Sequence, residues 1–151
     1  IFVGQITKIS PPQWNQDSGE DWRQWETAMA ALPIRYLEVA VIKPITETEA
    51  LTTPLSITTL ALDVTLDEKG NIAHYDETAS GLKTGDQAVF FVRQGKIAWR
   101  NGARPANMFL GAPEQSYFKL QDDGLYHGQL IEKPLALETL IQRILEARAI
   151  P

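Results

Sequence analysis

The stretch between residues 81 and 102, GLKTGDQAVFFVRQGKIAWRNG, alternates glycine-containing turns with runs of β-branched and aromatic residues. Gln87–Arg93 and Lys96–Arg100 are the two runs. Gln94-Gly95 lies between them and has the composition of a two-residue hairpin connection. The pattern predicts a β-hairpin at the centre of the fold.

The two faces of this predicted hairpin differ in chemistry because side chains alternate along a strand. One face is wholly apolar and is expected in the core: Ala88, Phe90, Val92, Ile97 and Trp99. The other face mixes apolar and cationic side chains: Val89, Phe91, Arg93, Lys96, Ala98 and Arg100. Arg93 faces Lys96 across the turn in this register. The second face is therefore either a partly covered sheet face or a binding face.

Further strands are predicted from β-branched runs that end at proline, glycine or polar turns. Gly4, inside the first strand, indicates a bulge or a close backbone approach. The stretch 101–115 has little periodicity and is expected to be a loop. The other expected strands are 1–9, 34–45, 55–66, 72–75, 116–121 and 125–131.

Helical spacing of apolar residues occurs in two places. A Trp-rich insertion at 13–33 contains Asp21–Leu32, where tryptophan, methionine and leucine recur at helical intervals. The C-terminal segment, about 134–149, carries a leucine and isoleucine stripe with arginines toward its end, as the helix dipole favours. We expect a short helix in the insertion and a C-terminal helix that covers a sheet.

Short strands joined by turns, without alternating helices, favour an antiparallel β architecture over a parallel α/β sheet. The length of 151 residues suits one domain, 1–151, with a core of its own. We therefore predict a mainly β fold, a small antiparallel barrel with the helical insertion and the C-terminal helix at its periphery.

Three segments carry a resemblance to a known fold: the opening IFVGQITKI, the long strand IRYLEVAVIK and the later LKTGDQAVFFV. A first strand with an internal glycine, an extended partner strand and a Leu-x-x-Gly turn into a core strand resemble OB-like barrels of the netrin or metalloproteinase-inhibitor type. The chain lacks the cysteines typical of those secreted inhibitors and has the Trp-rich insertion instead. The resemblance therefore implies the fold and carries no inhibitory activity over.

Composition limits the possible functions. The absence of cysteine removes disulfides, thiolate metal sites and cysteine nucleophiles, and no apolar run has the length of a membrane span. The net charge of −5 argues against general affinity for polyanions, although residues 81–120 hold six basic and two acidic residues. The chain starts at Ile1 rather than methionine, so we expect a processed product and an extracytoplasmic or secreted protein.

Motifs for catalysis are not found in the sequence. No serine sits in a nucleophile-elbow context, and the GLKTGD turn precedes a strand rather than a helix, so it is not a phosphate-binding loop. His74 and Asp76 would point the same way in a strand, but a polar turn edge is the interpretation that we favour over a metal site. We therefore expect no catalytic residue, no metal and no cofactor.

Three functions stay open. The first is a non-catalytic binding module with a protein partner, because the predicted fold is a common interaction scaffold. The second is binding of single-stranded nucleic acid or another polyanion through the cationic aromatic face. The third is an enzyme whose site is assembled from distant residues. The candidate binding residues are Phe91, Arg93, Lys96, Arg100, Tyr117 and Lys119.

Overall fold

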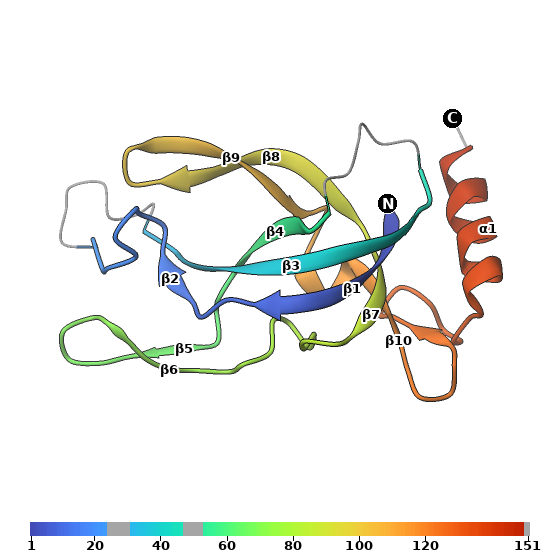
Figure 1. Ribbon diagram of the computed structural model, residues 1–151, viewed down its shortest axis with the longest axis horizontal. Helices are drawn as coiled ribbons and strands as arrows, with labels where there is room; N and C mark the ends of the chain where they lie inside the picture. Colours follow the sequence, from blue (N-terminus) through green and yellow to red (C-terminus); the bar gives the residue numbers. More distant parts are fainter. Residues whose placement is uncertain (24–30, 47–52, 150–151) are drawn as a thin grey trace.

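The computed structural model describes residues 1–23, 31–46 and 53–149 (Figure 1). Within these residues the chain is mainly strand, with a single α-helix, α1 (Leu137–Arg148), near the C-terminus. The other elements are β1 (Phe2–Ile9), β2 (Gln13–Trp14), β3 (Pro33–Pro44), β4 (Leu55–Leu60), β5 (Val64–Leu66), β6 (Ile72–Tyr75), β7 (Gln87–Phe90), β8 (Val92–Trp99), β9 (Gly102–Phe109), η2 (Pro113–Gln115), β10 (Tyr117–Leu120) and β11 (Tyr126–His127). The predicted mainly β class is confirmed.

Nine strands of the described residues form one sheet in the order β11-β10-β7-β1-β3-β4-β9-β8, and β2 pairs with β3 beside this path. β5 and β6 form a separate antiparallel hairpin. β4 and β9 run parallel, unlike the other paired strands of the described residues. β8 and β11, at the two ends of the order, do not pair with each other within the described part of the chain. The sheet is therefore not closed into the barrel that the strand pattern predicts.

β7 and β8 are separated by one residue, Phe91, and form an almost continuous strand. The Phe91 N–H donates to the Ser116 carbonyl, and the Phe91 carbonyl accepts from the Leu110 N–H, each at 2.9 Å. Backbone groups of one residue in a strand point to the same side, so β9 and β10 flank the same side of this strand. β1 flanks the opposite side along β7 alone.

The predicted turn at Gln94-Gly95 is wrong, because β8 continues through both residues. They pair with Asn107 and Ala106 of β9. A Cβ on Gly95 would lie 2.5 Å from the terminal methyl carbon of Met108, an atom at the end of a flexible side chain. The hairpin instead turns after Trp99, where Gly102 has a φ of 119°.

The predicted loop at 101–115 is also wrong over its first half, where β9 pairs with the whole of β8. Pro105 faces Lys96 in this ladder. Proline is tolerated at strand positions whose nitrogen is not needed for the ladder. Arg93 consequently faces Met108 and not Lys96.

Two hydrophobic clusters lie on the two faces of β7. Ala88 and Phe90 belong to the first cluster, together with Phe2, Leu37 and Ile57. Val89 is fully buried in the second cluster, which contains Val3, Phe118, Leu140 and Ile144. The apolar hairpin face is thus confirmed as core at Ala88, Phe90 and Trp99, while Val92 and Ile97 are half-buried. Val89, predicted on the mixed face, is core because α1 packs on that face through Leu140 and Ile144.

α1 lies at one end of the molecule in Figure 1 and packs on the second cluster through Leu140 and Ile144. Both side chains are buried, at 2% and 7% exposure. The predicted hairpin that precedes it is confirmed where Lys119 pairs with His127 and Leu120 with Tyr126, but its second strand ends at His127 and not at Ile131. The C-terminal helix is therefore part of the fold.

β1 pairs with β3 along most of its length, and the register of this pair shifts between Val3 and Gly4. A Cβ on Gly4 would lie 2.5 Å from Val39 Cγ1 and 3.1 Å from the Ala40 carbonyl oxygen. The bulge and the close backbone approach predicted at Gly4 are both confirmed.

The single strand expected at 55–66 is two strands, β4 and β5. Between them Asp63 forms an ion pair with Arg35 of β3, at 2.8 Å. The Arg35 side chain is buried and also donates to the carbonyls of Asp76 and Thr78. A buried guanidinium needs such partners, so these bonds hold the start and end of the β5–β6 hairpin against β3.

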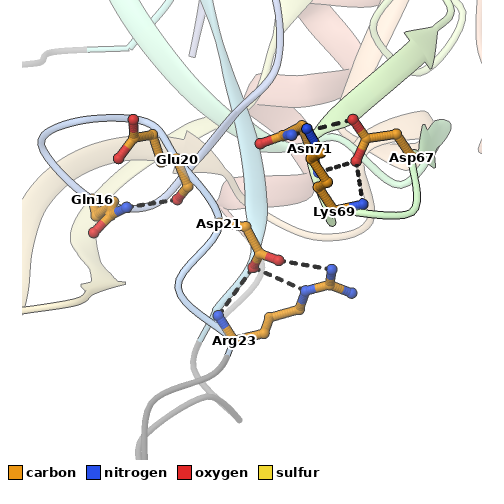
Figure 2. Close-up of polar contacts among 7 residues, drawn as sticks. All are labelled: Gln16, Glu20, Asp21, Arg23, Asp67, Lys69 and Asn71. Atoms are coloured by element: carbon orange, nitrogen blue, oxygen red, sulfur yellow. Dashed lines mark hydrogen bonds and ion pairs between the residues drawn. The ribbon is translucent and has the colours of Figure 1, made fainter.

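The turn of the β5–β6 hairpin lies against the N-terminal loop. Figure 2 shows Asp67 accepting bonds from Lys69 and Asn71, while Asp21 pairs with Arg23 at 2.9 Å. The Asn71 side chain and backbone lower the pKa of Asp67, and the Arg23 guanidinium lowers that of Asp21. Gly70 has a φ of 84°, a conformation that favours glycine, and a Cβ there would meet the ends of the Asp21 and Arg23 side chains.

The Trp-rich insertion is described only in part. The helix predicted for Asp21–Leu32 falls largely on residues 24–30, which lie outside the described residues. Trp22 is buried at 1% exposure, and residues 21–23 are not helical.

We expect Gly4→Ala to lower the free energy of unfolding by about 1–3 kcal/mol, because the added methyl overlaps Val39 in a packed ladder. Urea denaturation measures the difference. Gly111→Ala is the matched control, since its Cβ would meet only Ser116 Oγ at 3.7 Å. Equal stability of the Gly4 variant and wild type would contradict the close approach.

Candidate binding site

Asn15 joins the N-terminal loop to the tip of the β8–β9 hairpin. Its Nδ2 donates to the Ala98 carbonyl at 2.9 Å, and its own carbonyl accepts the Arg100 N–H at 3.0 Å. Its Oδ1 accepts from Trp22 Nε1 and from the Leu32 N–H. Because Asn15 is fully buried, these bonds replace water and hold the loop on the last residues of β8.

The arginine side chains at this hairpin tip contact other side chains of the protein itself. Arg104 forms an ion pair with Asp17 at 2.6 Å and lies over the Trp99 ring, 4.4 Å from its centroid. Arg100 is half-buried and donates to Gln16 Oε1 at 2.8 Å. Figure 1 shows the N-terminal loop, in blue, beside the tip of this hairpin. Arg100, a predicted binding residue, therefore lies against the chain's own loop.

Arg93 and Lys96 lie in the exposed middle of β8. They are three residues apart on one strand, so their side chains point to opposite faces of the hairpin. Within the described residues neither takes part in an ion pair. Their charges are thus available to a partner at the edge of the sheet.

Tyr117 and Lys119 line a surface hollow of about 720 Å³ together with Ser80, Glu114 and His127. The Tyr117 hydroxyl donates to the Ser80 carbonyl at 2.7 Å; burial raises the pKa of Tyr117, and the charges of Glu114 and Asp86 raise it further. Lys119 pairs with Asp86 at 2.7 Å, and only 19% of its side chain is exposed. The charge of Lys119 is neutralised inside the protein rather than presented to a polyanion.

Phe91 lies at the junction of β7 and β8 and packs edge-on against Phe118, with ring centroids 5.5 Å apart. It is half-buried beside the second hydrophobic cluster. Its ring forms one wall of a groove of about 580 Å³ between α1 and the sheet.

The groove beside α1 is lined mainly by apolar side chains. Leu110 and Leu130 stand at its margin with 59% and 65% of their surface exposed. Exposed apolar surface gathered in one hollow is typical of a binding site. The helix side adds two exposed guanidinium groups, Arg143 and Arg148, which form no ion pair within the described residues.

The structure thus distributes the predicted binding residues over several places. Phe91 lies in the groove, Arg93 and Lys96 on β8, Arg100 at the hairpin tip, and Tyr117 with Lys119 in the hollow. The sequence analysis missed the other groove residues and Asn15. Leu110, in a predicted loop, and Leu130, at the end of a predicted strand, gave no sign that they share one surface.

His127, in β11, contacts Asp123 of the turn between β10 and β11, with Nε2 and Oδ2 2.9 Å apart. Bonds from the Leu125 N–H and from His127 lower the pKa of Asp123. The described residues contain no group of three or more histidine, aspartate or glutamate side chains placed to hold a metal ion. None of the described helices has the length and apolarity to cross a membrane.

Compared with protein-family models, curated proteins and solved structures, this chain matches none.

We expect Asn15→Ala to lower the free energy of unfolding by about 2–4 kcal/mol, because it leaves the Trp22 N–H and the Ala98 carbonyl without their partner. Thermal and urea denaturation measure the loss. Asn107→Ala, which removes one exposed bond to Ser56, is the control and should cost below about 1 kcal/mol. Similar losses in the two variants would contradict the role of Asn15.

Proposed function

We propose that this chain is a non-catalytic interaction module whose partner is a protein. The groove between α1 and the sheet carries the proposal. It combines exposed leucines with an aromatic wall, a composition that suits the apolar anchor residues of a protein ligand.

Charge favours a particular partner. Arg143 and Arg148 add positive charge to the margin of the groove, on a chain whose net charge is −5. A partner segment that places apolar side chains against Leu110 and Leu130, and a carboxylate near Arg143, complements this surface. We therefore propose that the groove binds an apolar segment that carries acidic residues.

An OB-like module is supported by the order of the core strands. β1, β3 and β4 form an antiparallel meander, β9 lies parallel to β4, and the β7–β8 strand pairs with β1 at one end and with β9 along the other. OB-like folds use such a partly open sheet as a scaffold for ligands. Polyanion binding, the alternative, has less support, because Lys119 and Arg104 are paired with carboxylates.

The test is selection of twelve-residue peptides from a random library displayed on phage, followed by titration of the synthetic peptides. We expect enriched peptides with apolar and acidic residues, and about tenfold weaker binding to the double variant Leu110→Glu with Leu130→Glu, which makes the groove polar and acidic. Fluorescence anisotropy measures the affinities.

The control is Leu62→Glu, which changes a leucine that is 79% exposed and lies outside the groove. It should leave the affinities unchanged. A selection without enrichment over a blank surface, or peptides that bind the groove variant as tightly as wild type, would overturn the proposal.

A further inference from the structure

β8 lies at the end of the sheet order and pairs only with β9 among the described strands. The bonds of Asn15 show which backbone groups face the other way. Both the Ala98 carbonyl and the Arg100 N–H point to Asn15 and therefore away from β9. Backbone direction alternates along a strand, so Val92, Gln94 and Lys96 direct their N–H and C=O groups to the same free edge.

A hydrogen bond at the opposite end of the strand independently indicates which residues direct their backbone groups toward β9. The Phe91 carbonyl accepts from Leu110, which precedes β10 and follows β9 on the paired side. Backbone direction alternates, so the N–H and C=O groups of every second residue after Phe91 point to β9; these residues are Arg93, Gly95 and Ile97. The open part of the edge is therefore the segment from Val92 to Lys96, bounded at one end by the Asn15 contacts.

This segment is exposed in the structure. Arg93, Gln94 and Lys96 are all exposed, and Gly95 is partly so. Val92, the first residue with outward backbone groups, also lines the groove beside α1. An extended chain on this edge would therefore continue into the apolar groove.

We propose that the free edge of β8 binds an extended segment of the partner as an added β-strand, with two acidic residues three positions apart; this rests on the proposed function and specifies its binding mode. Strand addition takes its affinity from main-chain hydrogen bonds and its specificity from neighbouring side chains. Here the neighbours are Arg93 on one face and Lys96 on the other, which are three residues apart. The partner residues opposite them have the same separation.

The same charges disfavour a second copy of this chain as the occupant. Two β8 edges placed side by side would bring Arg93 and Lys96 of each copy close together, and like charges across a strand pair destabilise it. Lysine and arginine on an edge strand are a common protection against self-association. An acidic segment removes this repulsion.

The probe is a fluorescein-labelled peptide, Val-Glu-Thr-Val-Glu-Val-Thr-Leu, blocked at both ends, and its counterpart with lysine in place of both glutamates. We expect wild type to bind the glutamate peptide at least about tenfold tighter than the lysine peptide, with the preference decreasing as salt rises. The double variant Arg93→Glu with Lys96→Glu should reverse the preference.

The backbone contribution is tested with Gln94→Pro against Gln94→Ala. Proline removes an N–H that faces the free edge and none that faces β9, and its ring obstructs an added strand. Gln94→Pro should lower the affinity for the glutamate peptide about tenfold. Gln94→Ala keeps the N–H and should change this affinity by less than about twofold. Circular dichroism verifies that each variant is folded. If Gln94→Pro does not fold, the binding of the Arg93→Glu with Lys96→Glu variant is the test of strand addition.

Two results would overturn strand addition: no binding of the glutamate peptide up to millimolar concentration, or binding that neither Gln94→Pro nor the charge reversal changes. The groove variant separates this inference from the proposed function. Library-selected peptides could lose affinity for the Leu110→Glu with Leu130→Glu variant and keep wild-type affinity for Gln94→Pro. That result would support the interaction module and contradict strand addition.

Discussion

The hydrogen bonds of Asn15 are the constraint on which the candidate site depends. One buried amide holds the indole of Trp22, the backbone of Leu32 and the end of β8 in fixed positions. It also bonds the outward backbone groups of Ala98 and Arg100, whereas Arg93, Gln94 and Lys96, nearer Val92, are exposed. The protein therefore closes one end of a sheet edge with its own loop and presents the remainder to solvent.

The open edge follows from the way the chain crosses its own sheet. β7 is covered on both sides, by β1 and β10, and on both faces, by two hydrophobic clusters. Beyond Phe91 the same strand continues as β8, which pairs with β9 within the described residues. One continuous strand is therefore largely buried in its first half and mostly exposed or half-buried in its second half.

Sequence periodicity was enough to predict β1, β3, the β10–β11 hairpin and α1, because their apolar patterns are local. Gln94-Gly95 misled because a glycine can lie in a turn or within a strand, and only the pairing of these residues with Asn107 and Ala106 decides between the two. Of the candidate site, the exposed charges of Arg93 and Lys96 were predictable. Asn15 was not, since its side-chain partners lie 7, 17 and 83 residues away.

The direction of the backbone groups of β8 is best measured by amide hydrogen exchange of the wild-type protein, followed by NMR. Amides bonded across a ladder exchange slowly, and amides directed to solvent exchange fast. The structure predicts slow exchange at Arg93, Gly95 and Ile97 and fast exchange at Gln94 and Lys96. Uniform protection along these residues, or the opposite alternation, would contradict an open edge on β8.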